Sequence, residues 1–268
     1  KATTGGHSTA LKAGDIVPLR TAGVPIELKI VSANGKVVGE EKPLAVSCAK
    51  HGKPPVEDES DNMRSLGIKF SYGDFTFLDL GAGTGAASRV ILDLYPRSTA
   101  ILADYSAEMM RVGEREMQRF AGRYRFVEFD MSAGGEWPAA IPATLEAVVT
   151  SMCVHHLPDD RKRSLFAEIF DHLAPGGWYF NYDPVRTEDP LVEATWRRVN
   201  DREDPETAAR RRNWTPLDHA RWDNHVRYII PLGPQLEFLR SAGFEGIDVY
   251  WKQLENLIYG GRRPVAGS

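Results

Sequence analysis

The residues best suited to chemistry begin at three glycines in alternate positions, Gly81, Gly83 and Gly85. They follow a β-rich run that ends at Leu80 and precede a helix-like stretch that begins near Ala86. Glycine accepts positive φ angles and lets a ligand approach the backbone, and the first N–H groups of a helix attract anions. The pattern therefore predicts a nucleotide-like cofactor bound over a strand, a tight turn and a helix start.

Acidic and histidine side chains follow the later strands that the sequence predicts. These residues are Asp104, Asp130, His155 with His156, and Asp183. The carboxyl ends of parallel strands meet at one edge of an open α/β sheet, so we expect these side chains to converge. Asp104 is placed to accept hydrogen bonds from ribose hydroxyls, and Asp130 from an adenine amino group. His155, His156 and Asp183 are candidate general bases, or else they line the pocket wall and end their strands.

From residue 75 onward the expected elements alternate between strands and helices. The expected strands are 75–80, 99–103, 124–129, 145–154, 178–182, 244–251 and 254–259. The expected helices are 86–95, 107–121, 159–173 and 235–242, with further helices and a long loop over 185–230. This alternation predicts an α/β fold, doubly wound, in which a mainly parallel seven-stranded sheet has helices on both faces.

Ordered motifs give residues from about 75 to 268 a family resemblance. With LDLGAGTG, ILADYS, VEFDMS, SMCVHHLP and LAPGG in this order, the region resembles a class I S-adenosylmethionine-dependent methyltransferase. The resemblance implies a Rossmann-like sheet and methyl transfer to a small-molecule acceptor, which residues 185–230 would cover. It implies an S-adenosylmethionine site formed by Asp79, Gly81, Ala82, Gly83, Gly85, Asp104, Tyr105, Met109, Asp130, Met131 and Ser151.

Within that implied site, different residues would hold different parts of the cofactor. Asp79 and the three glycines would hold the methionine portion, and Asp104 the ribose. Asp130 with Met131 would hold the adenine, against which Met109 would pack.

Other functions stay open at this point. Gly81, Gly83 and Ala86 also satisfy the G-x-G-x-x-G/A dinucleotide fingerprint, so a nicotinamide-dependent oxidoreductase is one alternative. A noncatalytic cofactor-binding or interaction protein is another. A metal site is not predicted, because no H-E-x-x-H or Cys/His ligand spacing is found among His51, His155, His156, His219 and His225.

The first quarter of the chain differs from the rest, and we expect residues 1–72 to form a small β-rich segment ahead of a methyltransferase domain at 73–268. Asn34-Gly35 predicts one hairpin turn, and Gly73-Asp74 predicts another between 68–72 and 75–80. Residues 10–80 also resemble an internal segment of metallo-β-lactamase-fold hydrolases, but Ala82 stands where a metal-bridging aspartate would follow. The run 75–80 cannot pair as both folds require, so we expect it to be a junction shared by two unrelated families.

The overall composition excludes several classes of partner. The 268 residues carry a net charge of −4, which gives no general attraction to nucleic acids or anionic membranes. The two cysteines, Cys48 and Cys153, form no C-x-x-C pair, and no apolar run of about 18 residues or signal-peptide pattern is present. We therefore expect a cytoplasmic protein of undetermined oligomeric state, with a small-molecule substrate and without membrane partners.

Overall fold

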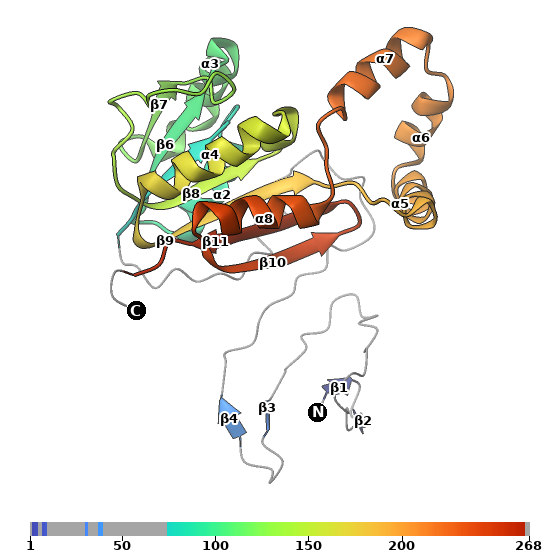
Figure 1. Ribbon diagram of the computed structural model, residues 1–268, viewed down its shortest axis with the longest axis horizontal. Coiled ribbons are helices and arrows are strands. Elements are labelled where there is room, and N and C mark those ends of the chain that lie inside the picture. Colours follow the sequence, from blue (N-terminus) through green and yellow to red (C-terminus); the bar gives the residue numbers. More distant parts are fainter. Residues whose placement is uncertain (1, 5–6, 10–29, 32–36, 40–73, 266–268) are drawn as a thin grey trace. The chain divides into compact units, whose positions relative to one another are not determined.

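The computed structural model describes residues 2–4, 7–9, 30–31, 37–39 and 74–265 (Figure 1). Its contacts divide the chain into two units, Lys1–Lys69 and Phe70–Ser268. The first unit holds two antiparallel pairs, formed by β1 (Ala2–Thr4) with β2 (His7–Thr9) and by β3 (Ile30–Val31) with β4 (Val37–Gly39). Pairing of Val31 with Val37 agrees with the hairpin predicted at Asn34-Gly35. The rest of the β-rich segment predicted over 1–72, including its strand at 68–72, lies outside the described residues.

The second unit is built on a seven-stranded sheet with the strand order β10-β11-β9-β8-β5-β6-β7. Its five parallel strands are β5 (Thr76–Leu80), β6 (Thr99–Asp104), β7 (Tyr124–Glu128), β8 (Leu145–Ser151) and β9 (Leu173–Pro184). The hairpin of β10 (Glu245–Gln253) and β11 (Asn256–Arg262) adds two antiparallel strands next to β9. This sheet confirms the predicted fold class.

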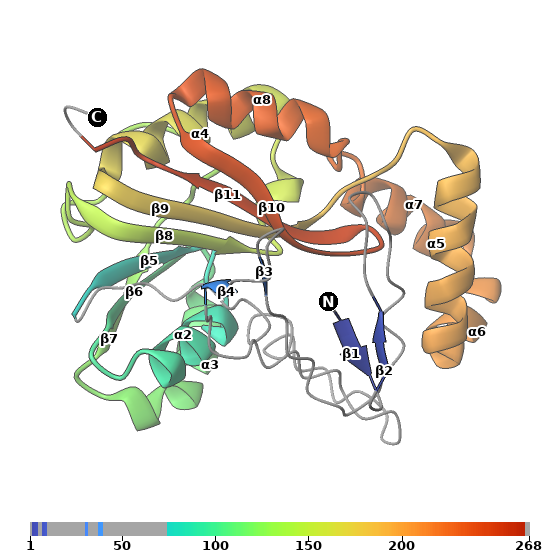
Figure 2. The ribbon, with the colours of Figure 1, turned by 90° about the horizontal axis from the view of Figure 1, so that it is seen from below.

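Helices cover both faces of the sheet (Figures 1 and 2). On one face lie α2 (Ala86–Leu94) and α3 (Ala107–Glu116), and on the other α4 (Asp159–His172) packs beside α8 (Leu232–Ala242). Short 3₁₀ turns, Gln118–Phe120 and Val154–His156, follow α3 and β8. Three further helices, α5 (Pro190–Glu203), α6 (Pro205–Arg212) and α7 (Pro216–His225), project past one end of the sheet. In the described part of the chain, no helix is both long enough and apolar enough to cross a membrane.

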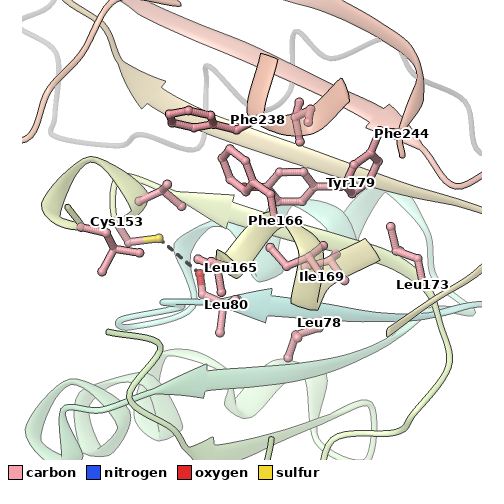
Figure 3. Packing of buried hydrophobic residues seen from close by; sticks show 14 of the residues in the cluster. Leu78, Leu80, Cys153, Leu165, Phe166, Ile169, Leu173, Tyr179, Phe238 and Phe244 are labelled. Carbon is pink, nitrogen blue, oxygen red and sulfur yellow. Dashed lines mark hydrogen bonds between the residues drawn. The ribbon is translucent and has the colours of Figure 1, made fainter. Parts of the chain in front are cut away.

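Apolar residues at helical spacing attach α4 to the sheet. Leu165, Phe166 and Ile169 are fully buried in the same cluster as Leu78 and Leu80 of β5 (Figure 3). Burying a side chain of this size stabilises a fold by about 1.5–3 kcal/mol relative to leaving it exposed. The packing therefore holds the sheet rigid beneath the turns that follow its strands.

Strand β5 lies in the interior of the sheet and corrects one prediction. Residues Phe77–Leu80 pair with β6 on one side and with β8 on the other. Both edges are occupied, so the predicted hairpin between 68–72 and 75–80 is wrong. The Gly73-Asp74 turn signal indicated the hairpin, whereas the continuous buried run Phe77–Leu80 is typical of a central parallel strand that is covered on both faces.

Candidate functional site

The turn after β5 places three glycines in left-handed backbone conformations. The φ angles of Gly81, Gly83 and Gly85 are 75°, 54° and 80°, which side chains with a Cβ rarely adopt. A Cβ on Gly81 would lie 2.6 Å from Cys153 Sγ, and one on Gly85 would lie 2.7 Å from a methyl of Leu102. The first and third glycines thus permit close packing beneath the turn.

The middle glycine has a different neighbourhood. A Cβ on Gly83 would meet only the terminal methyl of Met109, at 3.3 Å, and Gly83 itself is half-buried. Its backbone is therefore the part of the turn that a ligand can approach, and Met109 lies beside it, while the contact of Met109 with adenine stays a prediction.

Asp79 places an unpaired carboxylate oxygen next to this turn. Its side chain is fully buried, and Oδ2 accepts hydrogen bonds from the backbone N–H of Ser88 at 3.2 Å and from the Ser88 hydroxyl at 2.7 Å. Oδ1 is buried and has no hydrogen-bond partner among the described residues. Burial raises the pKa of Asp79 to about 6, while the hydrogen bonds from Ser88 oppose this shift. A cationic or N–H group of a ligand would satisfy the free oxygen.

Asp104 joins the glycine turn to the start of α3. Its Oδ2 accepts the N–H of Gly83 at 2.8 Å, and its Oδ1 accepts the N–H of Ser106 at 2.8 Å. The Ser106 hydroxyl in turn accepts the N–H of Met109 and caps the helix. Each carboxylate oxygen can accept a second hydrogen bond, so Asp104 still has capacity for ligand hydroxyls.

The remaining residues of the implied cofactor site occupy varied positions. Met131 lies near the turn, because its terminal methyl would be 3.2 Å from a Cβ on Gly81. Tyr105 is exposed after β6, and Ser151 ends β8 half-buried. The N–H of Ala82 donates to a backbone carbonyl in β6. These four residues stay predictions as cofactor contacts.

Asp130 forms a local turn in the loop after β7. Its Oδ1 accepts the N–H of Ser132 at 2.8 Å and the Ser132 hydroxyl at 2.6 Å, and these bonds lower the pKa of the exposed carboxyl. The contact of Asp130 with adenine stays a prediction.

The structure brings His155 and Asp183 together in a buried pair. The distance from His155 Nδ1 to Asp183 Oδ1 is 2.7 Å, and the backbone N–H of His155 donates to Asp183 Oδ2 at 2.9 Å. A proton on Nδ1 is needed for the first of these bonds, which leaves the lone pair on Nε2. That Nε2 is buried and is unpaired within the described part of the chain.

A chain of buried polar groups supports this pair from behind. Asn181 donates from Nδ2 to Asp183 Oδ2 at 3.2 Å and to the hydroxyl of Tyr259 at 2.8 Å. Tyr259 donates to Gln235 on α8, and Thr150 donates to Asn181 Oδ1 at 2.8 Å. Sequence reasoning missed Asn181, although its place two residues before Asp183 puts both on one face of β9.

Two further histidines lie beside His155. The ring centroid of His156 is 4.0 Å from that of His155, and the ring of His225 is 5.4 Å from His155 and 5.0 Å from His156. His156 and His225 are exposed, yet partial burial and neighbouring His155 lower the pKa of each. His225 ends α7, far along the chain, so no local spacing could predict this cluster.

The buried carboxyl of Asp79 gives a testable pH dependence. Its pKa is about 6 in the folded protein and 3.8 for an unperturbed aspartate, the value taken for the unfolded chain. Between these two pH values only the unfolded chain releases the proton. The contribution of Asp79 to the free energy of unfolding is thus complete below pH 3.8 and falls by about 3 kcal/mol as the pH rises past 6. In Asp79→Asn this loss is absent.

Urea unfolding of both proteins from pH 4 to pH 8 measures the effect. The free energy of unfolding of Asp79→Asn, relative to that of the unmodified chain, should be higher at pH 8 than at pH 4 by about 3 kcal/mol. Curves that stay parallel would show that Asp79 ionises normally.

Comparison with known proteins finds a family match in the central region. Residues 77–177 match the family model described as a methyltransferase domain. A trans-aconitate 2-methyltransferase from Azoarcus sp. (strain BH72) is 27% identical over 169 residues, which are 62% of this chain and 60% of that protein. The reducing polyketide synthase Preu2 from Preussia isomera is 26% identical over 185 residues, which are 68% of this chain and 7% of the synthase. The chain thus spans less than two thirds of each of these relatives.

Solved structures share the fold. An O-methyltransferase family protein from Burkholderia thailandensis superposes with a TM-score of 0.54 at 17% identity, covering 77% of this chain and 55% of that one. Human N-acetylserotonin methyltransferase, solved in complex with S-adenosylmethionine, superposes with a TM-score of 0.52 at 17% identity. This match covers 77% of this chain and 52% of that protein's chain. Residues 77–177 therefore match a methyltransferase domain, and the chain shares the fold of these two solved methyltransferases.

Proposed function

We propose that this chain transfers a methyl group from S-adenosylmethionine to a small-molecule acceptor. The observation that carries the proposal is the arrangement around the glycine turn, where Asp79 offers an unpaired buried oxygen and Asp104 offers a carboxylate. S-adenosylmethionine supplies a methyl group on a cationic sulfonium that a nucleophile can attack. Asp79 would accept from the methionine amino group, Gly83 would admit the cofactor to the backbone, and Asp104 would accept from the ribose.

A nicotinamide-dependent oxidoreductase would use the same glycine turn. The two functions differ in which cofactor the chain binds. Calorimetry on the full chain should show saturable binding of S-adenosylmethionine and S-adenosylhomocysteine and none of NADH. Binding of NADH alone would contradict the proposal.

Asp104→Asn should weaken the binding of S-adenosylmethionine by about 10- to 100-fold. The variant keeps one acceptor for the N–H of Gly83 but loses the charged pair of oxygens, and hydrogen bonds to charged groups contribute about 1.5–3 kcal/mol each. The matched control is Asp93→Asn, which removes the same charge at the far end of α2, where Asp93 pairs with Arg119. Equal affinity in both variants would remove Asp104 from the site.

We propose that His155 is the general base and that Asp183 is its positioning residue. Asp183 fixes the imidazole through two hydrogen bonds, so the lone pair on Nε2 keeps one direction. A proton from the acceptor would pass to Nε2 as the acceptor attacks, and the adjacent carboxylate would stabilise the imidazolium that forms. His156 is another candidate from the sequence, but its ring is exposed, so we assign the base to the buried ring of His155.

His155→Gln should lower kcat by about 10²–10⁴-fold while the Kd for S-adenosylmethionine stays the same. Release of S-adenosylhomocysteine is the readout, with phenols as acceptors, because a phenol carries a proton at neutral pH and a carboxylate does not. The exposed His219→Gln serves as the matched control and should keep full activity. An undiminished kcat in His155→Gln would show that the acceptor needs no base from this ring.

The first acceptors to test are small carboxylic acids, because the Azoarcus relative is named for trans-aconitate. A second source of acceptors is suggested by the relative from Preussia isomera, in which the similar region is part of a reducing polyketide synthase. In both cases we propose that the acceptor reaches the site beside α5, α6 and α7, which project past the end of the sheet where β8 and β9 end.

We also propose that residues 1–72 form a segment separate from a methyltransferase region at 73–268, in the cytoplasm. Division of the contacts between Lys1–Lys69 and Phe70–Ser268 supports the boundary. The low number of cysteines is consistent with a reducing compartment.

A further inference from the structure

Three histidines from two distant parts of the chain meet at the end of β8. His155 and His156 belong to the 3₁₀ turn after this strand, and His225 is the last residue of α7. One ring nitrogen from each of the three lies within 4.8 Å of the others. Nothing in the methyl-transfer proposal uses His225, so this convergence needs its own explanation.

A second observation makes the cluster more than a group of neighbouring rings. The side chain of His155 is only 2% exposed, and its Nε2 has no hydrogen-bond partner in the part of the chain that the structure describes. A buried polar atom without a partner is costly to the fold, so a ligand that accepts its lone pair would stabilise this region.

We propose that His155, His156 and His225 bind a divalent transition-metal ion of the zinc type. Neutral imidazole is a ligand that zinc, cobalt, nickel and copper prefer, whereas magnesium and calcium require oxygen ligands that the three rings do not offer. A tetrahedral zinc ion with bonds of about 2.0–2.1 Å separates its nitrogen ligands by about 3.3 Å. Closing the present spacing requires rotation of the two exposed rings, His156 and His225, and the fourth position is left for water or another small ligand.

The surroundings of His155 match those of metal-bound histidines. Such residues commonly donate their other ring N–H to a carboxylate, which fixes the tautomer and strengthens the ligand. Asp183 accepts from His155 Nδ1 at 2.7 Å and is itself held by Asn181. The ligand atom of His155 is therefore Nε2, already oriented before an ion arrives.

Metal binding and base catalysis would use the same lone pair. This consequence rests on the proposed function, because it concerns His155 as the general base. An imidazole whose Nε2 is bound to zinc cannot accept a proton there, so occupancy by the metal stops methyl transfer that depends on this base. The ion would also fix the end of α7 beside the end of β8.

Calorimetric titration of the full chain with zinc chloride, after removal of metals by a chelator and dialysis, tests the site directly. We expect one ion per chain, with affinity at least about tenfold weaker in His225→Ala and in His156→Ala, since each variant removes one of three ligands. The matched control is His219→Ala, which removes an exposed histidine from the same helix and should bind zinc as the unmodified chain does. Circular dichroism confirms that the variants, whose replaced side chains are exposed, remain folded.

Cobalt provides an independent readout. Co²⁺ bound to the three imidazoles should give the visible absorption of a low-coordinate site in the unmodified chain and in His219→Ala, and it should be lost in His225→Ala. Absence of saturable zinc binding, or equal binding and equal cobalt spectra in the unmodified chain and His225→Ala, would overturn the site.

Metal binding can be tested independently of methyl transfer. The binding measurements need neither S-adenosylmethionine nor an acceptor, so a failure of methyl transfer leaves them valid. Where methyl transfer is observed, zinc should inhibit the unmodified chain at least about tenfold more strongly than His225→Ala. Inhibition that is equal in the two proteins would overturn the competition for His155.

Discussion

Strand β5 is hydrogen-bonded to a parallel strand on each side, and the site depends on this central position. Pairing of Phe77–Leu80 with both β6 and β8 brings the ends of three strands to one place, so the turn at Gly81–Gly85 lies between the residues that follow its neighbours. Asp104 at the end of β6 reaches the N–H of Gly83 from one side. Cys153, after β8, donates to the carbonyl of Leu80 from the other (Figure 3).

Buried polar groups are arranged at this edge so that one atom of each is left for a ligand. Ser88 engages only Oδ2 of Asp79, and of the two nitrogens of the His155 ring Asp183 engages only Nδ1. The free Oδ1 and the free Nε2 are both buried, and neither has a partner within the described ranges of the chain. Each of these unpaired buried atoms destabilises the fold, and a ligand that hydrogen-bonds to it would offset that cost. Such an arrangement is typical of preorganised functional sites.

Local signals in the sequence were enough to predict the fold of residues 74–265 and the glycine turn. The strand, the glycines and the polar residues at strand ends each follow from nearby residues, and the topology of a parallel sheet then implies that His155 and Asp183 converge. The Gly73-Asp74 turn signal misled the hairpin prediction, because such a signal does not distinguish a hairpin strand from a central parallel one. The parts that could not be predicted depend on distant contacts, since Gln235 reaches Tyr259 only through α8 and His225 reaches His155 only through α7.

A crystal structure of the full chain grown with S-adenosylhomocysteine would show directly whether the cofactor binds over the glycine turn. We expect ligand density over Gly83. The ribose hydroxyls should lie within hydrogen-bond distance of the Asp104 carboxylate, and the amino group should face Asp79 Oδ1. Density for the ligand at another place on the molecule, with the turn from Gly81 to Gly85 left free at saturating concentration, would contradict it.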